Sequence, residues 1–211
     1  MTAERLVQLD DVTYESPRRM RVEDYLRLSA SLPGRYEYWD GLMYPQGWPP
    51  GSHSAMAGNS QTHSRLTVRL LAALEGHLSD GPCHAYNGDM RIYLDATRYV
   101  FPDAYVVCGE KIASNMYDLH DALMICEIRS QSTDGFDRGD KFEGYQGLPS
   151  LREYVLLDNR KIQATVLRRG EDGVWRYLIV FEGADLELET IGLRISLTHL
   201  YRGLALDSDT R

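Results

Sequence analysis

The sequence predicts an α/β fold, in which a mixed central β-sheet is flanked by helices and extended by antiparallel strands on its N-terminal and C-terminal sides. Residues 60–78 carry leucines at helical spacing, whereas residues 99–108 and 122–128 are apolar, β-branched runs typical of buried strands. The order along the chain is helix, hairpin, strand, helix, strand, which is typical of helices packed on a mixed sheet.

The length and composition predict one globular domain. The 211 residues are 43% hydrophobic and 26% charged, which is ordinary for a chain that buries a full core. We expect a flexible arm over residues 1–19, a single domain over residues 20–205 and a disordered tail over residues 206–211. An added edge strand is the alternative for the arm.

The sequence also predicts a cytoplasmic protein. No run approaches the apolar length of a membrane span, and the acidic, polar N-terminus is unlike a signal peptide. Cys83, Cys108 and Cys126 lie far apart without zinc-binding spacing, and all three cannot pair with one another. We therefore expect buried free thiols in a reducing compartment.

The first part of the domain is predicted to hold a helix and a hairpin. Residues 22–31 have helical spacing with two acidic residues near the start, and Pro33-Gly34 ends that helix. Residues 35–44 alternate around Asp40-Gly41, a strong signal for a hairpin turn. Glu37 lies on the first strand of this hairpin, where a solvent-facing carboxylate is the simplest interpretation.

A long loop and the clearest helix follow. Residues 45–59 are rich in Gly, Pro and Ser, so we expect a loop that is able to cover a functional site. The helix over residues 60–78 has His63 near its first turn, and a lone histidine in such a place is usually structural. Residues 83–94 and 98–108 are expected to pair as one antiparallel hairpin.

The rest of the chain continues the alternation of strands and helices. A central strand over residues 122–128 precedes a helix over residues 137–147. Further strands are predicted over residues 151–158, 163–168, 175–181, 185–189 and 193–200, with a short helix over residues 198–204.

Two of the predicted strands each deliver one carboxylate. Asp103 follows Pro102 in the first, and Glu127 lies near the end of the second. Side chains alternate across a strand, so Glu127 and Arg129 are expected on the same face. The opposite face is expected to hold Met124, Cys126 and Ile128.

Two interpretations of these carboxylates are open. Opposed carboxylates on neighbouring strands repel one another, and Mg²⁺ suits such a site because it takes one or two carboxylates and keeps several waters. In the structural alternative, Asp103 caps a turn and Glu127 pairs with Arg129 or Lys141, as surface ion pairs commonly do.

Six short motifs follow one another along the chain. They are Tyr36-Glu37 with Asp40-Gly41, His63, Pro102-Asp103, Glu127 with Ser130, Ser132 and Thr133, Asp137-Arg138 with Lys141 and Tyr145, and Glu153-Tyr154 with Asp158. Their order and spacing resemble the PD-(D/E)XK nuclease-like superfamily and, within it, the putative restriction endonuclease family, formerly a domain of unknown function. The resemblance covers roughly residues 20–200, and six ordered motifs are far more specific than any one of them.

The chain departs from the family pattern at several positions. Gln131 stands where the family usually has Pro, and Val155 stands where it has Trp. The Lys position of the superfamily holds Arg129. In this family that position is commonly not Lys, and the resemblance implies that Lys141 on the following helix substitutes for it.

The resemblance implies a restriction-endonuclease-like core with a metal-dependent active site. Asp103, Glu127 and the backbone carbonyl of Ile128 are the implied ligands of Mg²⁺ or Mn²⁺. Lys141 is implied to stabilise charge on the phosphate or to orient the attacking water. Glu37 is the candidate third acidic residue near the metal.

Four further residues are implied to support substrate or the catalytic groups. Arg129 is expected to grip a phosphate, since a guanidinium is always protonated and cannot act as a base. His63 is expected to position the substrate, and Tyr145 to hold Lys141 one helical turn away. Ser132 is expected to position a phosphate or to cap the helix. An ordinary ion pair with Asp137 is the alternative role for Lys141.

The implied function is hydrolysis of phosphodiester bonds in DNA by a metal-dependent endonuclease, with a homodimer as a plausible assembly. The alternative is a catalytically inactive nuclease-fold protein with a binding or regulatory role. The net charge of −8 argues against a protein that coats DNA, because phosphate contacts usually require a basic surface. It does not argue against a metal-dependent nuclease, whose carboxylates add negative charge that a bound cation offsets.

Overall fold

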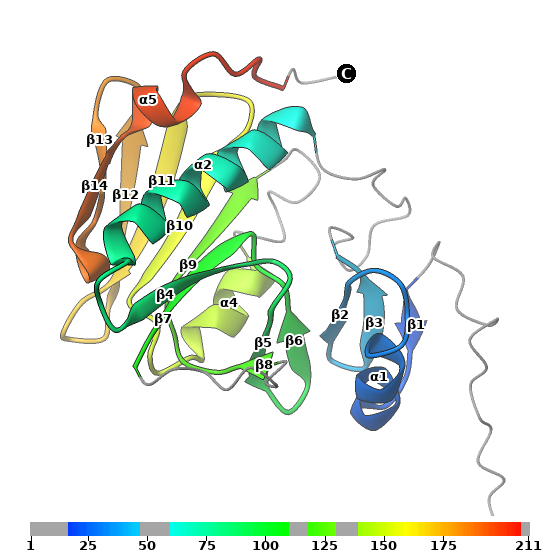
Figure 1. Ribbon diagram of the computed structural model, residues 1–211. Coiled ribbons are helices and arrows are strands. Elements are labelled where there is room, and N and C mark those ends of the chain that lie inside the picture. The colour runs from blue at the N-terminus through cyan, green and yellow to red at the C-terminus, as the bar shows by residue number, and fades with distance from the viewer. Residues whose placement is uncertain (1–16, 47–59, 110–117, 130–138, 208–211) are drawn as a thin grey trace, which may run out of the picture.

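The computed structural model describes residues 17–46, 60–109, 118–129 and 139–207, which form two six-stranded mixed sheets, a two-stranded sheet and flanking helices (Figure 1). The predicted α/β class, with mixed β-structure flanked by helices, is confirmed. The extra N-terminal strands form a sheet of their own rather than extending the central one.

The main sheet has the strand order β12-β11-β10-β9-β7-β4. Its strands are β4 (Cys83–Asn87), β7 (Ala104–Cys108), β9 (Ala122–Arg129), β10 (Glu153–Asp158), β11 (Gln163–Arg169) and β12 (Trp175–Phe181). Only β9 and β10 run parallel within this sheet, and the other neighbours are antiparallel. The predicted central strand is therefore β9, between β7 and β10.

The two faces of the main sheet are covered by different elements. Helix α2 (Gln61–Leu78) packs on one face together with α5 (Leu197–Tyr201) and the two-stranded sheet of β13 (Asp185–Leu188) and β14 (Leu193–Ser196), which is joined by the 3-10 turn Glu189–Ile191. Helix α4 (Asp140–Gln146) packs on the other face. As predicted, β9 presents to the α2 face the side chains of Met124, Cys126 and Ile128.

The N-terminal sheet has the order β1-β3-β2-β6-β5-β8. Its strands are β1 (Arg18–Arg19), β2 (Tyr36–Trp39), β3 (Leu42–Pro45), β5 (Arg91–Asp95), β6 (Arg98–Val100) and β8 (Asp118–Leu119), and α1 (Val22–Ser29) packs beside it. The hairpin predicted around Asp40-Gly41 is confirmed, and both residues have positive φ, 47° and 89°. The edge strand that was the alternative for the N-terminal arm is present as β1.

The long hairpin predicted over residues 83–108 divides between the two sheets. Its outer halves, β4 and β7, pair in the main sheet, and its inner halves, β5 and β6, pair in the N-terminal sheet. A turn closed by the bond from Met90 N to Asn87 O, 3.2 Å, interrupts one arm, and Pro102, which has no N–H to donate, interrupts the other. This break leaves Asp103 at the start of β7.

The expectation of three free thiols is wrong for two of the cysteines. Cys83 and Cys108 face each other directly in the β4–β7 pairing and form a disulfide. They are 25 residues apart in sequence, so only the strand register brings them together. Cys126 is a buried free thiol, and burial, followed by the nearby carboxylates, raises its pKa well above the usual value.

The C-terminal segment stays attached to the domain farther than expected. Asp207 N donates to Asn159 O at 3.0 Å, and the Asp207 carboxylate accepts from Asn159 Nδ2 at 2.6 Å. The hydroxyl of Thr62 donates to Ala205 O beside the start of α2. Among the described residues, no helix is both long and apolar enough to cross a bilayer.

Candidate functional site

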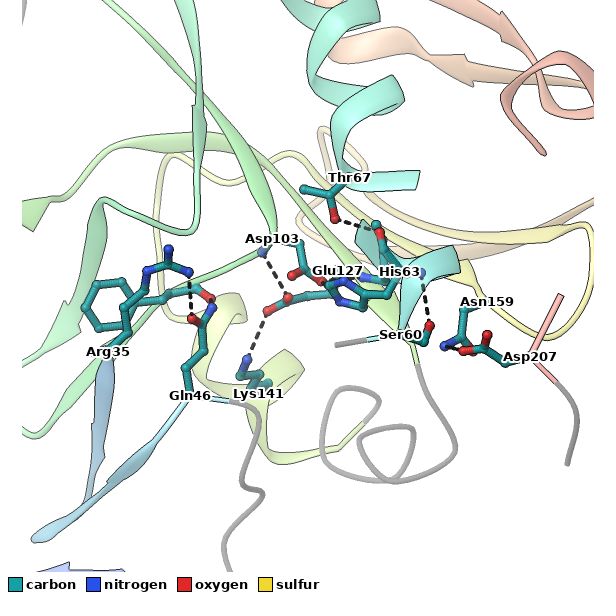
Figure 2. A network of polar contacts seen from close by, with 12 residues as sticks. Arg35, Gln46, Ser60, His63, Thr67, Asp103, Glu127, Lys141, Asn159 and Asp207 are labelled. Atoms are coloured by element: carbon teal, nitrogen blue, oxygen red, sulfur yellow. Dashed lines mark hydrogen bonds and ion pairs between the residues drawn. The ribbon is translucent and has the colours of Figure 1, made fainter. Parts of the chain in front are cut away.

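Asp103 and Glu127 lie side by side where β7 begins and β9 ends. The register pairs Ala104 with Cys126, so the next residues outward are Asp103 and Glu127. Asp103 N donates to Glu127 Oε2 at 3.2 Å, and Ile128 N donates to Asp103 Oδ2 at 2.7 Å. Each carboxylate is thus fixed by the backbone of the other strand (Figure 2).

The Phe-Pro-Asp turn that carries Asp103 is held from the N-terminal sheet. Glu37 Oε1 accepts from Phe101 N at 3.0 Å, and Gln46 Nε2 donates to Phe101 O at 2.7 Å. Arg35 in turn donates to Gln46 Oε1 at 3.2 Å. Glu37 is 1% exposed, so the solvent-facing interpretation of this residue is wrong. Sequence reasoning missed Gln46 and Arg35, which no motif marks.

Lys141 and Tyr145 reach the site from α4. Lys141 Nζ lies 3.1 Å from Glu127 Oε1 and 3.3 Å from Glu37 Oε1, and Tyr145 OH donates to Glu127 Oε1 at 2.8 Å. Both side chains leave the same helix face, one turn apart. Gly144 lets α4 approach the N-terminal sheet closely, since a Cβ there would meet the Trp39 ring at 2.6 Å. Tyr145 and Lys141 thus lie on the same face of α4, and both contact the Glu127 carboxylate.

His63 joins the cluster from the first turn of α2. Ser60 caps this helix by accepting from His63 N at 3.1 Å, and the cap fixes the position of the residue. His63 Nε2 lies 3.1 Å from Asp103 Oδ2. The imidazole is nearly buried, at 7% exposure, so it holds one face of the Asp103 carboxylate.

Among the residues that the structure describes, carboxylates outnumber cationic side chains in this cluster. Glu37, Asp103 and Glu127 contribute three carboxylates, and Lys141 contributes one ammonium. Counted over the Asp, Glu and Lys side chains of the described residues, this is a formal excess of two negative charges in a nearly buried setting, where uncompensated charge is costly. A divalent cation has the charge that balances this excess.

Arg129 is placed away from these carboxylates. Its guanidinium is 1% exposed and donates to Asp158 Oδ2 at 2.6 Å, one strand over on β10. Burial alone would raise the pKa of Asp158, but hydrogen bonds from Arg160 and the charge of Arg129 outweigh it, so this pKa lies below its ordinary value. Tyr201 OH donates to Asp158 O at 2.8 Å. Asp158 belonged to a sequence motif, yet nothing in the sequence indicated its partner.

The oxygen donors at the Asp103–Glu127 junction fit a hard divalent cation. Arg129 O accepts from Asn159 N at 3.2 Å on the β10 side. Backbone groups alternate across a strand, so the Ile128 carbonyl is directed to the β7 side, where Asp103 lies. Two carboxylates and a carbonyl match the few protein ligands that Mg²⁺ takes besides water. Within the described ranges, no three His, Cys, Asp or Glu side chains group closely enough to form a metal cage by themselves.

Several predicted features fall outside the described residues. Ser132, the ion pair between Asp137 and Lys141, and most of the loop over residues 45–59 are among them. The structural alternative for Glu127 is partly met, since Glu127 does pair with Lys141. The nuclease interpretation also brings Lys141 to these carboxylates. The contact between Glu127 and Lys141 therefore does not distinguish the structural interpretation from the nuclease interpretation.

Comparison with protein families gives one match that spans most of the chain. The family Uma2, described as "Putative restriction endonuclease", matches residues 22–199. Uncharacterized protein slr1290 of Synechocystis sp. is 31% identical over 188 residues, which covers 89% of this chain and 94% of that protein. Uncharacterized protein sll1609 of the same organism is 27% identical over 175 residues, covering 82% and 93%.

A similar fold is found among solved structures. The crystal structure of a putative nuclease belonging to DUF820 from Anabaena variabilis superposes with a TM-score of 0.65 at 15% identity, covering 86% of this chain and 97% of that one. At this identity the likeness establishes the fold alone.

Proposed function

Because the chain belongs to the Uma2 family of putative restriction endonucleases, we propose that it is a divalent-metal-dependent endonuclease that hydrolyses phosphodiester bonds in DNA. The observation that carries the proposal is the junction of Asp103 and Glu127, with Lys141 Nζ 3.1 Å from Glu127 Oε1. Residues 103, 127 and 141 come from three separate elements, and their convergence leaves an excess of negative charge that a cation would balance.

Restriction endonuclease-like families generally use divalent metals. In this chain the groups that would hold Mg²⁺ or Mn²⁺ are the carboxylates of Asp103 and Glu127 and the carbonyl of Ile128. When bound, such an ion lowers the pKa of a coordinated water and offsets negative charge on the scissile phosphate. The metal is inferred from the negative charge and the oxygen atoms of these three groups.

The residues around the carboxylates have separate roles in this proposal. Lys141 is the cation that stabilises charge on the phosphate, and Glu37 holds its ammonium at 3.3 Å. Tyr145 fixes the Glu127 carboxylate by a 2.8 Å hydrogen bond. His63 orients Asp103 from the opposite side, at 3.1 Å. These contacts restrict both carboxylates to one geometry, as a site that stabilises charge without rearrangement requires.

Arg129 and Ser132 are less well supported as substrate ligands than His63 and Lys141 are. The Arg129 guanidinium is buried and donates to Asp158, so its contacts support a structural role for its charge. Ser132 lies outside the described residues and remains a proposed phosphate ligand. The substrate-binding part of the proposal therefore rests on His63 and Lys141.

The test is cleavage of a supercoiled plasmid with Mg²⁺ or Mn²⁺. Wild-type protein should nick the plasmid, and Asp103→Asn and Glu127→Gln should nick it at least about 10²-fold more slowly. Asp172→Asn is the matched control, because Asp172 is an exposed carboxylate in the turn between β11 and β12. A parallel reaction with single-stranded RNA distinguishes the two polymers. Cleavage at the wild-type rate in both site variants would contradict the proposal.

A non-catalytic role is the second candidate function. It is favoured by the hydrogen bonds that the carboxylates already accept from the protein. Glu127 accepts hydrogen bonds from Asp103 N, Lys141 and Tyr145, so its charge is partly satisfied without a metal. In that case no metal condition yields cleavage, and Asp103→Asn changes only stability. The plasmid assay, combined with unfolding curves of the same variants, separates the two functions.

A further inference from the structure

Strand β12 forms an open, apolar edge of the main sheet. It pairs with β11 on one side and ends the strand order on the other (Figure 1). Tyr177, Leu178 and Phe181 are 54%, 50% and 60% exposed, and they are among the most exposed large apolar side chains in the described ranges. Natural edge strands usually carry Lys, Pro or inward charges that prevent pairing. Between Trp175 and Phe181 this strand has Arg176 as its single charge.

The edge is self-complementary when two copies pair antiparallel about a two-fold axis. Residues that face each other in such a pair must lie on the same side of the sheet. With the axis at Ile179, Tyr177 faces Phe181 of the second copy, and Leu178 faces Val180. Tyr177 and Phe181 are both exposed, so their contact buries new apolar surface on one face, whereas Val180 already packs in the core of its own chain at 6% exposure.

The charges select this register over its neighbours. With the axis at Ile179, Arg176 faces Glu182 of the second copy, and the symmetry makes the contact twice. With the axis at Leu178, Arg176 would face Val180 instead. Arg176 is bound within its own chain by Asp172 at 2.8 Å and is 62% exposed in its side chain. Asp172 binds both terminal nitrogens of Arg176, at 3.0 and 2.8 Å, so Glu182 of the second copy would share the exposed guanidinium with Asp172.

We propose that β12 is a homodimer interface, at which two copies pair antiparallel about Ile179 to form one continuous twelve-stranded sheet. The occupant is a second copy because the strand complements itself in both apolar pattern and charge. The interface lies three strands away from β9, so this inference stands independently of the proposed nuclease function.

The geometry also predicts where the two candidate sites lie in the dimer. A two-fold axis perpendicular to the sheet reverses the strand direction of the second copy. The C-terminal end of β9, which carries Glu127, would thus lie at opposite ends of the joined sheet in the two copies. This dimer does not place two sites side by side on one short duplex, so it serves assembly rather than concerted double-strand cleavage.

The experiment is sedimentation velocity over a wide range of protein concentration, with charge-reversal variants. Wild type should show a reversible monomer–dimer equilibrium. Arg176→Glu and Glu182→Arg should each weaken dimerisation by about tenfold, since each reversal creates two like-charge contacts. The double variant R176E/E182R should dimerise more tightly than either single variant, because the pairs between the copies are restored with exchanged signs, although a glutamate at position 176 is repelled by Asp172 of its own chain. Thermal unfolding of each variant controls for monomer stability.

A cysteine cross-link tests the position of the axis. Ile179→Cys should form an intermolecular disulfide under mild oxidation, because residue 179 faces itself across the axis. Leu178→Cys is the matched control and should cross-link far less, since it faces Val180. Three results would each overturn the proposal. They are a dissociation constant that is the same in wild type and in all three charge variants, a wild-type protein that is monomeric at every concentration, and equal cross-linking of the two cysteine variants.

Discussion

Two buried ion-pair clusters lie two residues apart on β9, and they differ in charge balance. The cluster around Glu127 holds three carboxylates, Glu37, Asp103 and Glu127, against the ammonium of Lys141. The cluster around Arg129 holds one carboxylate, that of Asp158, against two guanidinium groups. Among the described residues, carboxylates outnumber cations in the first cluster, whereas cations outnumber carboxylates in the second. Both clusters are buried and ion-paired, so the proposed metal site is distinguished by its larger number of carboxylates among the described residues.

The largest expected effect is on activity, at the carboxylate-rich cluster. Glu127→Gln keeps the shape and an acceptor for Tyr145 but removes the charge, so we expect the plasmid-nicking rate to fall by roughly 10²–10³-fold or more. Initial rates at saturating Mg²⁺ measure the loss, with Asp172→Asn as the control. Wild-type rates in the Gln variant would remove the functional distinction between the clusters.

The largest expected effect on stability is at the pair of Arg129 and Asp158. Asp158→Asn removes the buried carboxylate that accepts from both Arg129 and Arg160, and breaking a buried ion pair costs about 3–5 kcal/mol. Urea unfolding measures the free energy change. Asp172→Asn breaks an exposed pair with Arg176 and is expected to leave stability unchanged within error. If Asp158→Asn behaved like Asp172→Asn, the Arg129 pair would contribute nothing to folding.

The lowered pKa of Asp158 predicts a pH dependence of the same stability difference. The carboxyl has a lower pKa in the folded protein than its unfolded value of about 3.9. Its contribution is therefore complete above about pH 5 and is lost as the pH falls from about 4 through the folded pKa. The gap between wild type and Asp158→Asn should stay constant from pH 7 to about pH 5 and narrow in acid. Urea unfolding of both proteins across this range is the check, and a gap that widens in acid would contradict it.

Lys141→Met sharpens the comparison, because two measurements should move in different directions. Without the ammonium, charge on the phosphate is less stabilised, so the nicking rate should fall by about 10²-fold. The carboxylates gain negative charge, so calorimetric Mn²⁺ affinity should not fall and should rise by a few-fold. Loss of Mn²⁺ binding in this variant would indicate that Lys141 builds the site rather than acting on the substrate.

The smallest expected effect is that of Tyr145→Phe. The change removes one O–H donor to the Glu127 carboxylate, and a hydrogen bond to a charged group contributes about 1.5–3 kcal/mol. Unfolding stability should decrease by no more than that amount, and the nicking rate by less than about tenfold, since Lys141 still contacts Glu127. A larger activity loss would place the hydroxyl in contact with substrate.

Local signals predicted the elements that position the site. The leucine stripe predicted α2 to within one residue at each end, and Asp40-Gly41 predicted the β2–β3 hairpin. Alternation along residues 122–128 predicted which side chains of β9 share a face, and the structure places that face against α2. Each of these features is decided by residues close together in sequence.

Long-range pairing explains what sequence reasoning missed. The partner of Arg129 is Asp158, which depends on the parallel register of β9 and β10. The Cys83–Cys108 disulfide depends on the β4–β7 register. The division of the hairpin between two sheets reflects competition between strand partners. No local pattern encodes these choices, because they are made by tertiary packing.

The most direct test of the central claim is calorimetric titration of Mn²⁺ into wild-type protein and into Glu127→Gln, with Asp172→Asn as the control. We predict binding in wild type and in the control, and none in Glu127→Gln, with all three folded. Equal binding in wild type and Glu127→Gln, or no binding in wild type even with DNA present, would contradict the claim that the excess of carboxylates is a metal site.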